Sequence, residues 1–518
     1  SIGDSAFYYC NALPSITIPE SVTSISYAAF LRNEALTSIY IPYGLTNINS
    51  NTFNTCESLQ SVNIPDSVTS IGSNVFKGCR ALQHVTISDN LTGLGSGTFD
   101  GCVSLQSVTI PDSVTTIGNT TFDDCTALTS ITIPDSVTSI GQSAFNGCDV
   151  LRSLTIPDSV TSIGTRLCYS CDTLQSVIIG NGLTKIEDYA FANCDNLQSL
   201  TIGDSVTAID NGAFENCVAL QSLTIPDSVT EIASSAFSRC DALQSVIIPD
   251  SVTSMLYNAF ASCEGLQSVT IGNGLTSIDY RVFYQCVALQ SVIIPDNVTI
   301  IEGQAFQSCS ALQFVILGDG VTSIDESAFA VTGLTTVYMS DTIRGELGLT
   351  FGSGQSFYGA TNVTLVDKSV TTLTDINGIE YTLTISGELS SNDIANAISK
   401  TDLQSAIIGA TVTSLGTDAF SGCPAMESVS ISPTVTTIGA QVFLACTALQ
   451  SVTIPNSVTS IGSSAFQSCS ALQSLTIGNG LTSIGYRLFY DCSALQSVTI
   501  PDSVTSIDNY AFQYCSAL

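Results

Sequence analysis

The sequence predicts a repeat solenoid of mainly-β or α/β class, built from about twenty coils of 23 residues each. Phenylalanine recurs every 23 residues from Phe7 to Phe145, from Phe191 to Phe329 and from Phe420 to Phe512, and Cys168 stands where one Phe is due. A short alternation of apolar and polar residues lies in each interval, and one cysteine follows most of the phenylalanines. A fixed period in the range of roughly 20–50 residues is typical of solenoids, in which each coil buries its apolar side against its two neighbours.

The interval from Leu59 to Cys79 shows how one coil is built. Its first part fits the pattern L-x-x-L-x-L of a leucine-rich-repeat strand, with Leu59, Val62 and Ile64 pointing inward. The following proline cannot donate to a stacked strand ladder, so we expect the strand to end there. The segment V-T-S-I-G is predicted as a turn that returns two apolar residues to the core, and A-F-x-x-C as the outer side of the coil.

These segments resemble the BspA-like, treponemal-type family of leucine-rich-repeat surface proteins. The resemblance rests on L-x-S-V-T-I-P, V-T-S-I-G and A-F-x-x-C, as between Leu449 and Cys469, and it covers both repeat arrays. It implies a right-handed superhelix with a parallel sheet on its concave face. It also implies an extracellular or cell-surface protein for adhesion or recognition, with no enzymatic activity.

The repeats predict three regions: an array over 1–335, an atypical interruption over 336–402 and a second array over 403–518. Within the interruption, the glycine-rich stretch 344–360 is predicted as a loop or hinge, and 363–366 and 380–385 as strands. Residues 391–400 are predicted as a short helix with Ser391 or Asn392 as its N-cap. Degenerate repeats, a small β-rich cap or linker, and a ligand-binding insertion remain alternatives for this region.

The net charge of −32, with 12 basic against 44 acidic residues, argues against nucleic acid and anionic membrane surfaces as partners. The chain has no apolar run of about 18 residues, so we expect no membrane insertion in this segment. Both ends fall in mid-repeat. We therefore expect either a piece of a longer chain or a subunit whose ends are covered by neighbours, which allows head-to-tail self-association.

The cysteines form a column rather than a metal site. Seventeen of the 19 occupy one position per coil, Cys171 belongs to the same column, and Cys168 is the extra thiol. Thiols spaced one per coil do not converge tetrahedrally on zinc, so we expect small buried side chains. Disulfides between neighbouring coils in an oxidising compartment are the alternative, and the odd total leaves at least one thiol unpaired or intermolecular.

An acidic column follows the strand-ending prolines. It consists of Asp66, Asp112, Asp135, Asp158, Asp227, Asp250 and Asp502. These carboxylates are expected to accept backbone N–H groups in Asx turns. Because like charges at coil spacing repel each other, weak calcium binding by Asp66, Asp112, Asp135 and Asp158 is a second hypothesis, although no calcium-loop motif supports it.

The outward strand positions are predicted to form a Ser/Thr/Gln surface that suits many weak contacts with a long protein or glycan partner. Tyr40, His84 and Phe314 depart from the template and are the candidate binding residues. The rival interpretation is a structural subunit of a filament, sheath or wall that assembles through its uncapped ends.

The sequence predicts no enzymatic activity, catalytic residue or cofactor. His84 is the single histidine, and no P-loop, G-x-S-x-G or H-E-x-x-H motif is present. Four sequons permit N-glycosylation in a eukaryotic secretory protein, at Asn90, Asn119, Asn297 and Asn362.

Overall fold

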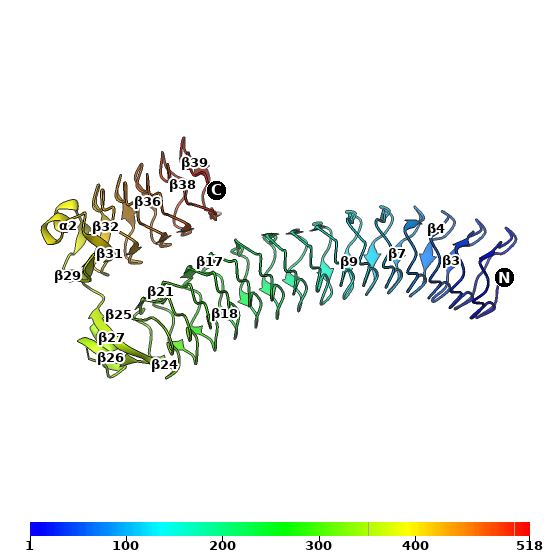
Figure 1. Cartoon of the computed structure of the whole chain (residues 1–518), viewed down its shortest axis with the longest axis horizontal. Helices are drawn as coiled ribbons and strands as arrows, with labels where there is room; N and C mark the ends of the chain where they lie inside the picture. The colour runs from blue at the N-terminus through cyan, green and yellow to red at the C-terminus, as the bar shows by residue number, and fades with distance from the viewer. Residues whose placement is uncertain (351, 502) are drawn as a thin grey trace. The chain divides into compact units, whose positions relative to one another are not determined.

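The computed structural model describes residues 1–350, 352–501 and 503–518. It is a parallel β-solenoid of about 21 turns of ~23 residues (Figure 1), which confirms the predicted fold class. Within the described residues, none of the regular coils contains a helix, so the fold is mainly β. Two compact units divide the chain: one comprises 1–220, 226–242 and 251–263, and the other 221–225, 243–250 and 264–518.

Although the coils at 107–110 and 130–133 are joined at this place only by an isolated bridge between Ser107 and Ser130, most regular coils begin with the predicted strand, which pairs in parallel with the strand one period away. Ser153 pairs with Ser176 and then with Ser199 in this way. In the first unit these long strands are β1 (Ser15–Ile16), β2 (Ser38–Ile39), β4 (Ser61–Asn63), β6 (His84–Thr86), β10 (Ser153–Ile156), β12 (Ser176–Ile179) and β14 (Ser199–Thr201). In the second unit they are β17 (Ser245–Ile248), β19 (Ser268–Ile271), β21 (Ser291–Ile293), β23 (Phe314–Ile316) and β25 (Thr336–Met339), followed in the second array by β31 (Leu403–Ile407), β33 (Ser428–Ser430), β35 (Ser451–Ile454) and β37 (Ser474–Ile477).

The V-T-S-I-G segment, predicted as a turn, contains a second short strand, so that prediction was incomplete. In the first unit the short strands are β3 (Asn47–Ile48), β5 (Ser70–Ile71), β7 (Gly93–Leu94), β8 (Thr116–Ile117), β9 (Ser139–Ile140), β11 (Ser162–Ile163), β13 (Lys185–Ile186), β15 (Ala208–Ile209), β16 (Glu231–Ile232) and β18 (Ser254–Met255). In the second unit they are β20 (Ser277–Ile278), β22 (Ile300–Ile301), β24 (Ser323–Ile324), β32 (Val412–Leu415), β34 (Thr437–Ile438), β36 (Ser460–Ile461), β38 (Ser483–Ile484) and β39 (Ser506–Ile507).

The threonine of this segment explains why the second strand forms in nearly every coil. The backbone N–H of Thr138 donates to the carbonyl of Thr115 at 2.9 Å, and its hydroxyl donates to the same oxygen at 3.2 Å. Thr161 repeats both bonds on Thr138. Each exposed threonine therefore satisfies its hydroxyl on the preceding coil and holds the two backbones in register.

The A-F-x-x-C segment is a turn in which two residues per coil have left-handed backbone conformations. In one coil these are Asn74 (φ 58°) and Gly78 (φ 69°). The N–H groups of Asn74, Phe76 and Gly78 donate to carbonyls of the next coil at 2.7–2.9 Å. Since left-handed residues interrupt right-handed helical backbone, the outer side of the coil is a ladder of turns. We refer to it as the turn segment.

The core is a stack of phenylalanine rings, as the 23-residue period predicts. Phe99 and Phe122 have ring centroids 5.5 Å apart, and Phe122 and Phe145 also lie at 5.5 Å with their planes within 3°. All three side chains are fully buried. Cys168 takes the next place in the column, and parallel stacking resumes between Phe191 and Phe214.

The first half of the interruption continues the sheet of the first array and ends it. Strand β27 (Ala360–Asp367) pairs in parallel with β25, and β26 (Gly352–Phe357) folds back onto β27 in antiparallel fashion. The ring of Phe357 lies 5.4 Å from that of Phe329, at the end of the phenylalanine stack. The Lys368 ammonium, 12% exposed, lies 2.7 Å from an Asp319 carboxylate oxygen and donates to the Leu317 carbonyl.

The second half opens the second array. Strands β28 (Thr371–Asp375) and β29 (Glu380–Leu383) form a hairpin whose first strand pairs with β31, and β30 (Gly387–Leu389) pairs with β32. Helix α2 (Ser391–Ala397) buries Ile394 against this core. The Lys400 ammonium donates to the carbonyls of Asp418 and Ser421 at 2.8 and 3.2 Å. The interruption thus supplies a closing hairpin and an opening cap.

Two local predictions in the interruption need correction. The stretch 344–360, expected to be loop, includes the end of helix α1 (Asp341–Glu346) and strand β26. Helix α1 begins before that stretch, where Ser340 caps it by accepting from the Ile343 N–H. The helix expected over 391–400 forms, but its N-cap is Ser390, whose side chain completes a capping box with Asp393. In the part of the chain that is described, no helix has the length and apolarity needed to cross a bilayer.

Candidate functional site

Three polar columns are formed by the outward side chains of the long strands and of the equivalent segments at 107–110 and 130–133, which an isolated bridge joins. We call these columns the long-strand face. In the first unit the columns are exposed at nearly every coil, and they include Gln60, Gln83 and Gln106; Ser61, Ser107 and Ser130; and Thr109, Thr132 and Thr155. Ile178 interrupts the threonine column and is 48% exposed. Parallel register places like side chains beside one another, as between Ser153 and Ser176. The face therefore presents hydroxyl and amide groups at the coil spacing of ~4.8 Å.

The three candidate binding residues lie at different places on this face. Tyr40 follows β2 and is 44% exposed, and His84 opens β6 as an exposed residue in register with Ser61. Phe314 opens β23 and is half-buried. Tyr40 and His84 are in coils two periods apart, whereas Phe314 lies ten periods farther along the sequence than His84. The sequence thus separates Phe314 from the other two.

Tyr40 belongs to a small aromatic patch that sequence reasoning only partly identified. Its hydroxyl donates to a Glu20 carboxylate oxygen at 2.5 Å, and its ring lies 6.5 Å from that of Tyr43, which is 64% exposed. The hydrogen bond to Glu20 raises the pKa of Tyr40 to about 12. The patch is an exposed pair of rings with one oriented phenol.

The aspartates after the strands accept backbone hydrogen bonds, as expected, but from the next coil. The Asp66 side chain accepts from the Asp89 N–H at 3.2 Å, and Asp158 accepts from the Asn181 N–H at 2.6 Å. Asp250 accepts from the Asn273 N–H in the same manner at 2.7 Å. Each such carboxylate therefore links two coils. Asp502 lies outside the described residues.

The calcium hypothesis remains a prediction. The four aspartates of this hypothesis are all exposed, and each coil supplies only one carboxylate at this position: Asp66, Asp112, Asp135 and Asp158. Over the described ranges, no group of three or more His, Cys, Asp or Glu residues is arranged to hold a metal ion. Calcium binds through six to eight oxygen ligands, which this single column would have to supply from several coils.

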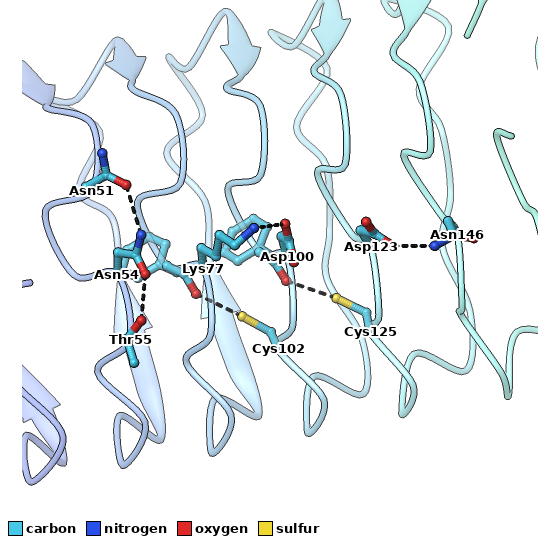
Figure 2. Close-up of polar contacts among 11 residues, drawn as sticks. Asn51, Asn54, Thr55, Lys77, Asp100, Cys102, Asp123, Cys125 and Asn146 are labelled. Atoms are coloured by element: carbon cyan, nitrogen blue, oxygen red, sulfur yellow. Dashed lines mark hydrogen bonds and ion pairs between the residues drawn. The ribbon is translucent and has the colours of Figure 1, made fainter. Parts of the chain in front are cut away.

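Except at Cys10 and Cys515, the cysteine column is buried, and all 19 cysteines are free thiols. The Cys102 thiol donates to the Phe76 carbonyl and the Cys125 thiol to the Phe99 carbonyl, each at 3.2 Å (Figure 2). Asn33 stands at this position in an earlier coil, and its amide donates to the Phe7 carbonyl at 2.8 Å. Since a cysteine thiol and an asparagine amide both occupy this position and both donate to a carbonyl, the column requires a small side chain with a hydrogen-bond donor.

Burial controls the reactivity of these thiols. Desolvation raises the pKa of Cys217 to about 12, although a hydrogen bond to the backbone opposes this rise. Cys10 is exposed, and Cys515 is half-buried with its pKa lowered to about 7 by a hydrogen bond with Cys492.

We expect a thiol-alkylating reagent to modify only Cys10 and Cys515 rapidly in the native protein. A thiol whose pKa is near 12 is about 10⁻⁴ ionised at pH 8, against about one tenth for an ordinary thiol of pKa 9. Reaction at the buried column should therefore stay slow as the pH rises towards 10 and become fast only after unfolding in urea. Mass spectrometry of alkylated peptides measures this, and rapid labelling of Cys125 or Cys217 in native protein would contradict it.

The turn segments carry a polar column beside the buried cysteines. Lys77 pairs with Asp100 at 2.6 Å, and the Asn146 amide donates to Asp123 at the same distance (Figure 2). Half-burial raises the pKa of the Asp123 carboxyl above its usual value, against the lowering effect of the Asn146 hydrogen bond. This column links neighbouring coils.

The four sequon asparagines are all exposed. The side-chain amides of Asn90 and Asn297 donate to carbonyls of the preceding coil at 2.8 and 2.5 Å. Asn119 accepts from the Gln142 N–H, and Asn362 has a left-handed backbone with φ 62°. N-glycosylation of these residues remains a prediction.

Sequence reasoning missed a group of arginines between tyrosine rings on the turn segments. They are Arg166, Arg281 and Arg487, and each has a tyrosine three residues later. The signal was the triplet of sequences R-L-C-Y, R-V-F-Y and R-L-F-Y, which breaks the repeat template at two positions together.

A family model described as the BspA type leucine-rich repeat region matches 1–129, 115–244, 230–345 and 394–518. The chain belongs to this family. No curated protein matches the sequence.

Solved structures of other leucine-rich-repeat proteins are similar to this chain. A leucine-rich cell surface protein of Faecalibacterium prausnitzii is 30% identical, with 65% of this chain and 90% of that chain covered and a TM-score of 0.37. A leucine-rich-repeat protein of Bacteroides ovatus is 20% identical over 97% of this chain and 85% of that chain, with a TM-score of 0.38. The leucine-rich-repeat protein of T. pallidum is 24% identical over 40% of this chain and 78% of its own, with a TM-score of 0.26.

Proposed function

We propose that this BspA-type protein is a non-enzymatic recognition protein outside the cell or on its surface, and that it holds a protein or glycan partner on the long-strand face. The observation that carries the proposal is the exposure of three polar columns over successive coils of the first unit. The thiols, phenylalanines and aliphatic residues of these coils are buried. The outward strand positions are therefore left for a partner.

The chemistry of this face suits an extended partner. Columns of serine, threonine and glutamine offer donors and acceptors at one repeating distance, and no single position concentrates them. Individually such contacts contribute only about 0.5–1.5 kcal/mol each, so useful affinity needs many in parallel. A glycan chain or an extended protein surface meets that requirement.

Tyr40, Tyr43 and His84 are the proposed anchors at one end of the face. Tyrosine is enriched among residues that dominate binding energy, because its ring supplies contact area with little loss of side-chain freedom. The Tyr40 ring is oriented by Glu20, and Tyr43 presents most of its surface to solvent. The family resemblance and the cell surface description of the F. prausnitzii protein support a surface role.

Three threonine-to-arginine substitutions on the long-strand face test the proposal. Thr109→Arg, Thr132→Arg and Thr155→Arg place bulky cations on an exposed column of three successive coils. We expect the wild-type chain to bind ligands on an array of immobilised glycans and matrix proteins, and the triple variant to lose at least about tenfold in affinity. Tyr40→Ala with Tyr43→Ala should also weaken binding severalfold.

The matched control places three arginines on the short strands β8, β9 and β11. Thr116→Arg, Ser139→Arg and Ser162→Arg change the charge equally and leave the threonine hydrogen bonds between coils in place; Thr116 and Ser162 are exposed and Ser139 is half-buried. This control should retain wild-type binding. If both triple variants lose binding equally, or if the long-strand variant binds like the wild type, the long-strand face is not the binding surface and the proposal fails.

A further inference from the structure

Three clusters on the turn segments place an arginine guanidinium against tyrosine rings. The Arg166 guanidinium carbon lies 5.4 Å from the centroid of Tyr169 and 5.9 Å from that of Tyr189. Arg281 lies 4.9 and 4.8 Å from Tyr280 and Tyr284. Arg487 has three rings around it, at 5.3 Å from Tyr486, 4.9 Å from Tyr490 and 5.7 Å from Tyr510. Cation–π attraction orients each of these guanidinium groups.

The arginines occupy one of the left-handed backbone positions of the coil. Their φ values are 56° for Arg166, 57° for Arg281 and 53° for Arg487, and other coils place Asn74, Gly97 or similar residues there. A residue with a long side chain adopts this conformation at an energetic cost, whereas glycine and asparagine adopt it readily. The R-x-x-Y sequence brings the tyrosine side chain of the same turn over the guanidinium.

These guanidinium groups have no acidic partner in a strongly acidic chain. Among the residues that the structure describes, none of the three has a carboxylate oxygen within 4.0 Å. The Arg281 Nε donates to the neutral Gln304 amide oxygen, and the Arg487 Nε is enclosed without a hydrogen-bond partner. Arg166 is exposed, and Tyr486 and Tyr510 are 42% and 51% exposed. Each cluster thus keeps an oriented, unneutralised cation beside accessible aromatic surface.

We propose that these arginine–tyrosine clusters bind the carboxylate of an acidic sugar. A guanidinium can donate two parallel hydrogen bonds to one carboxylate, and in Arg281 and Arg487 the two terminal Nη groups would supply them, because Nε is bonded to Gln304 in the first and enclosed in the second. The exposed rings of Tyr280, Tyr486 and Tyr510 offer apolar surface to the C–H groups of the sugar. The sites are distinct from the long-strand face and do not depend on the function proposed for it.

The size and charge of the clusters favour a sugar over a protein or a dense polyanion. One guanidinium and two or three rings match one or two sugar residues, whereas a stable protein interface buries about 800 Å² per partner. The net charge of −32 disfavours approach of a polyphosphate or a highly acidic protein. A glycan with isolated carboxylates experiences less of this repulsion and still satisfies the guanidinium.

Titration of the whole chain with four small probes tests the proposal. They are 3′-sialyllactose and trigalacturonate, which carry sugar carboxylates from two sources, neutral lactose, and a triglutamate peptide. We expect one or both acidic sugars to bind with Kd of about 0.1–1 mM and lactose and triglutamate to bind at least about tenfold more weakly. NMR or calorimetric titration measures this, and whichever acidic sugar binds identifies its source.

Two triple variants show whether the clusters are responsible. Arg166→Gln, Arg281→Gln and Arg487→Gln together should abolish acidic-sugar binding, and the corresponding lysine variants should lose at least about fivefold because lysine lacks the planar fork. The charge-matched triple variant Arg80→Gln, Arg152→Gln and Arg239→Gln should bind like the wild type. Thermal unfolding confirms that all variants fold. Equal binding of lactose or triglutamate, no binding of either acidic sugar, or full binding by the glutamine or lysine variants would overturn the proposal.

Discussion

Phe122→Ala is expected to lower the free energy of unfolding by about 3–5 kcal/mol, because it removes one ring from a continuous stack and leaves a cavity. The Phe122 side chain is fully buried, and it lies 5.5 Å from both Phe99 and Phe145. The backbone N–H groups of Phe99 and Phe145 donate to carbonyls of the following coil, so these neighbours cannot close the gap without moving whole coils. The loss therefore includes both the transfer of the ring and most of the cavity term. Urea denaturation followed by circular dichroism measures it.

Tyr27→Ala provides the comparison for Phe122→Ala. Tyr27 lies in the turn segment of another coil and is 53% exposed. Its truncation leaves no buried cavity, so we expect a change within about 0.5 kcal/mol. A Phe122→Ala variant as stable as Tyr27→Ala would mean that the phenylalanine stack contributes little to stability. Because contacts in a solenoid are made mainly with neighbouring coils, the variant is also expected to show a separate unfolding step around its own coil.

Gly359→Ala is expected to destabilise the hairpin that ends the first array by about 2–4 kcal/mol. Gly359 has φ 96° and lies in the tight turn between β26 and β27, beside Tyr358 with φ 41°. A Cβ atom at Gly359 would lie 2.8 Å from the Cα atom and 2.9 Å from the N atom of Ala330. Because the obstacle is backbone, a change of side-chain rotamer cannot relieve it. The turn must open and separate Phe357 from the end of the phenylalanine stack.

Gly378→Ala separates backbone strain from the close approach. Gly378 also has a left-handed backbone, with φ 77°, but nothing lies within 4 Å of a Cβ atom placed there. We expect this variant to lose only about 1 kcal/mol, the cost of the left-handed conformation alone. Hydrogen exchange reports the local effects, in the β26 and β27 amides for Gly359→Ala and in the β28 and β29 amides for Gly378→Ala. Equal losses in both variants would show that contact with Ala330 has no role in holding the turn.

The periodic part of the fold was predictable because every coil packs the same residue types against the same neighbours. The 23-residue spacing of Phe99, Phe122 and Phe145 predicts a column, and the structure confirms a ring stack. The single cysteine per coil predicts a buried column, which the thiols and the substitute Asn33 confirm. Such inferences succeed because identical residues in successive coils must occupy equivalent places against their neighbours.

Elements that depend on partners from other coils were less predictable. The Thr138 segment looks like a turn within its own coil, and it becomes a strand only because Thr115 and Thr161 lie beside it. The carboxylate of Asp158 was expected to bond within its turn, but it accepts from Asn181 of the next coil. Helix α1 was missed because its glycine-rich surroundings suggested a loop, whereas the Ser340 cap decides where it begins.

The sequence by itself determined that this protein is a solenoid of 23-residue coils. It also determined which residues form the core and which columns face outward, because the same residue types recur at the same positions of successive coils. Only the tertiary structure decided how the interruption ends one array and opens the next, since Phe357 and Lys400 act on coils that their own segments do not specify. It also decided that Arg487 lies among three tyrosines, one of them from the following coil. Contacts between coils form only when the coils stack. The sequence shows which residues are present, but it does not show which residues of different coils come into contact.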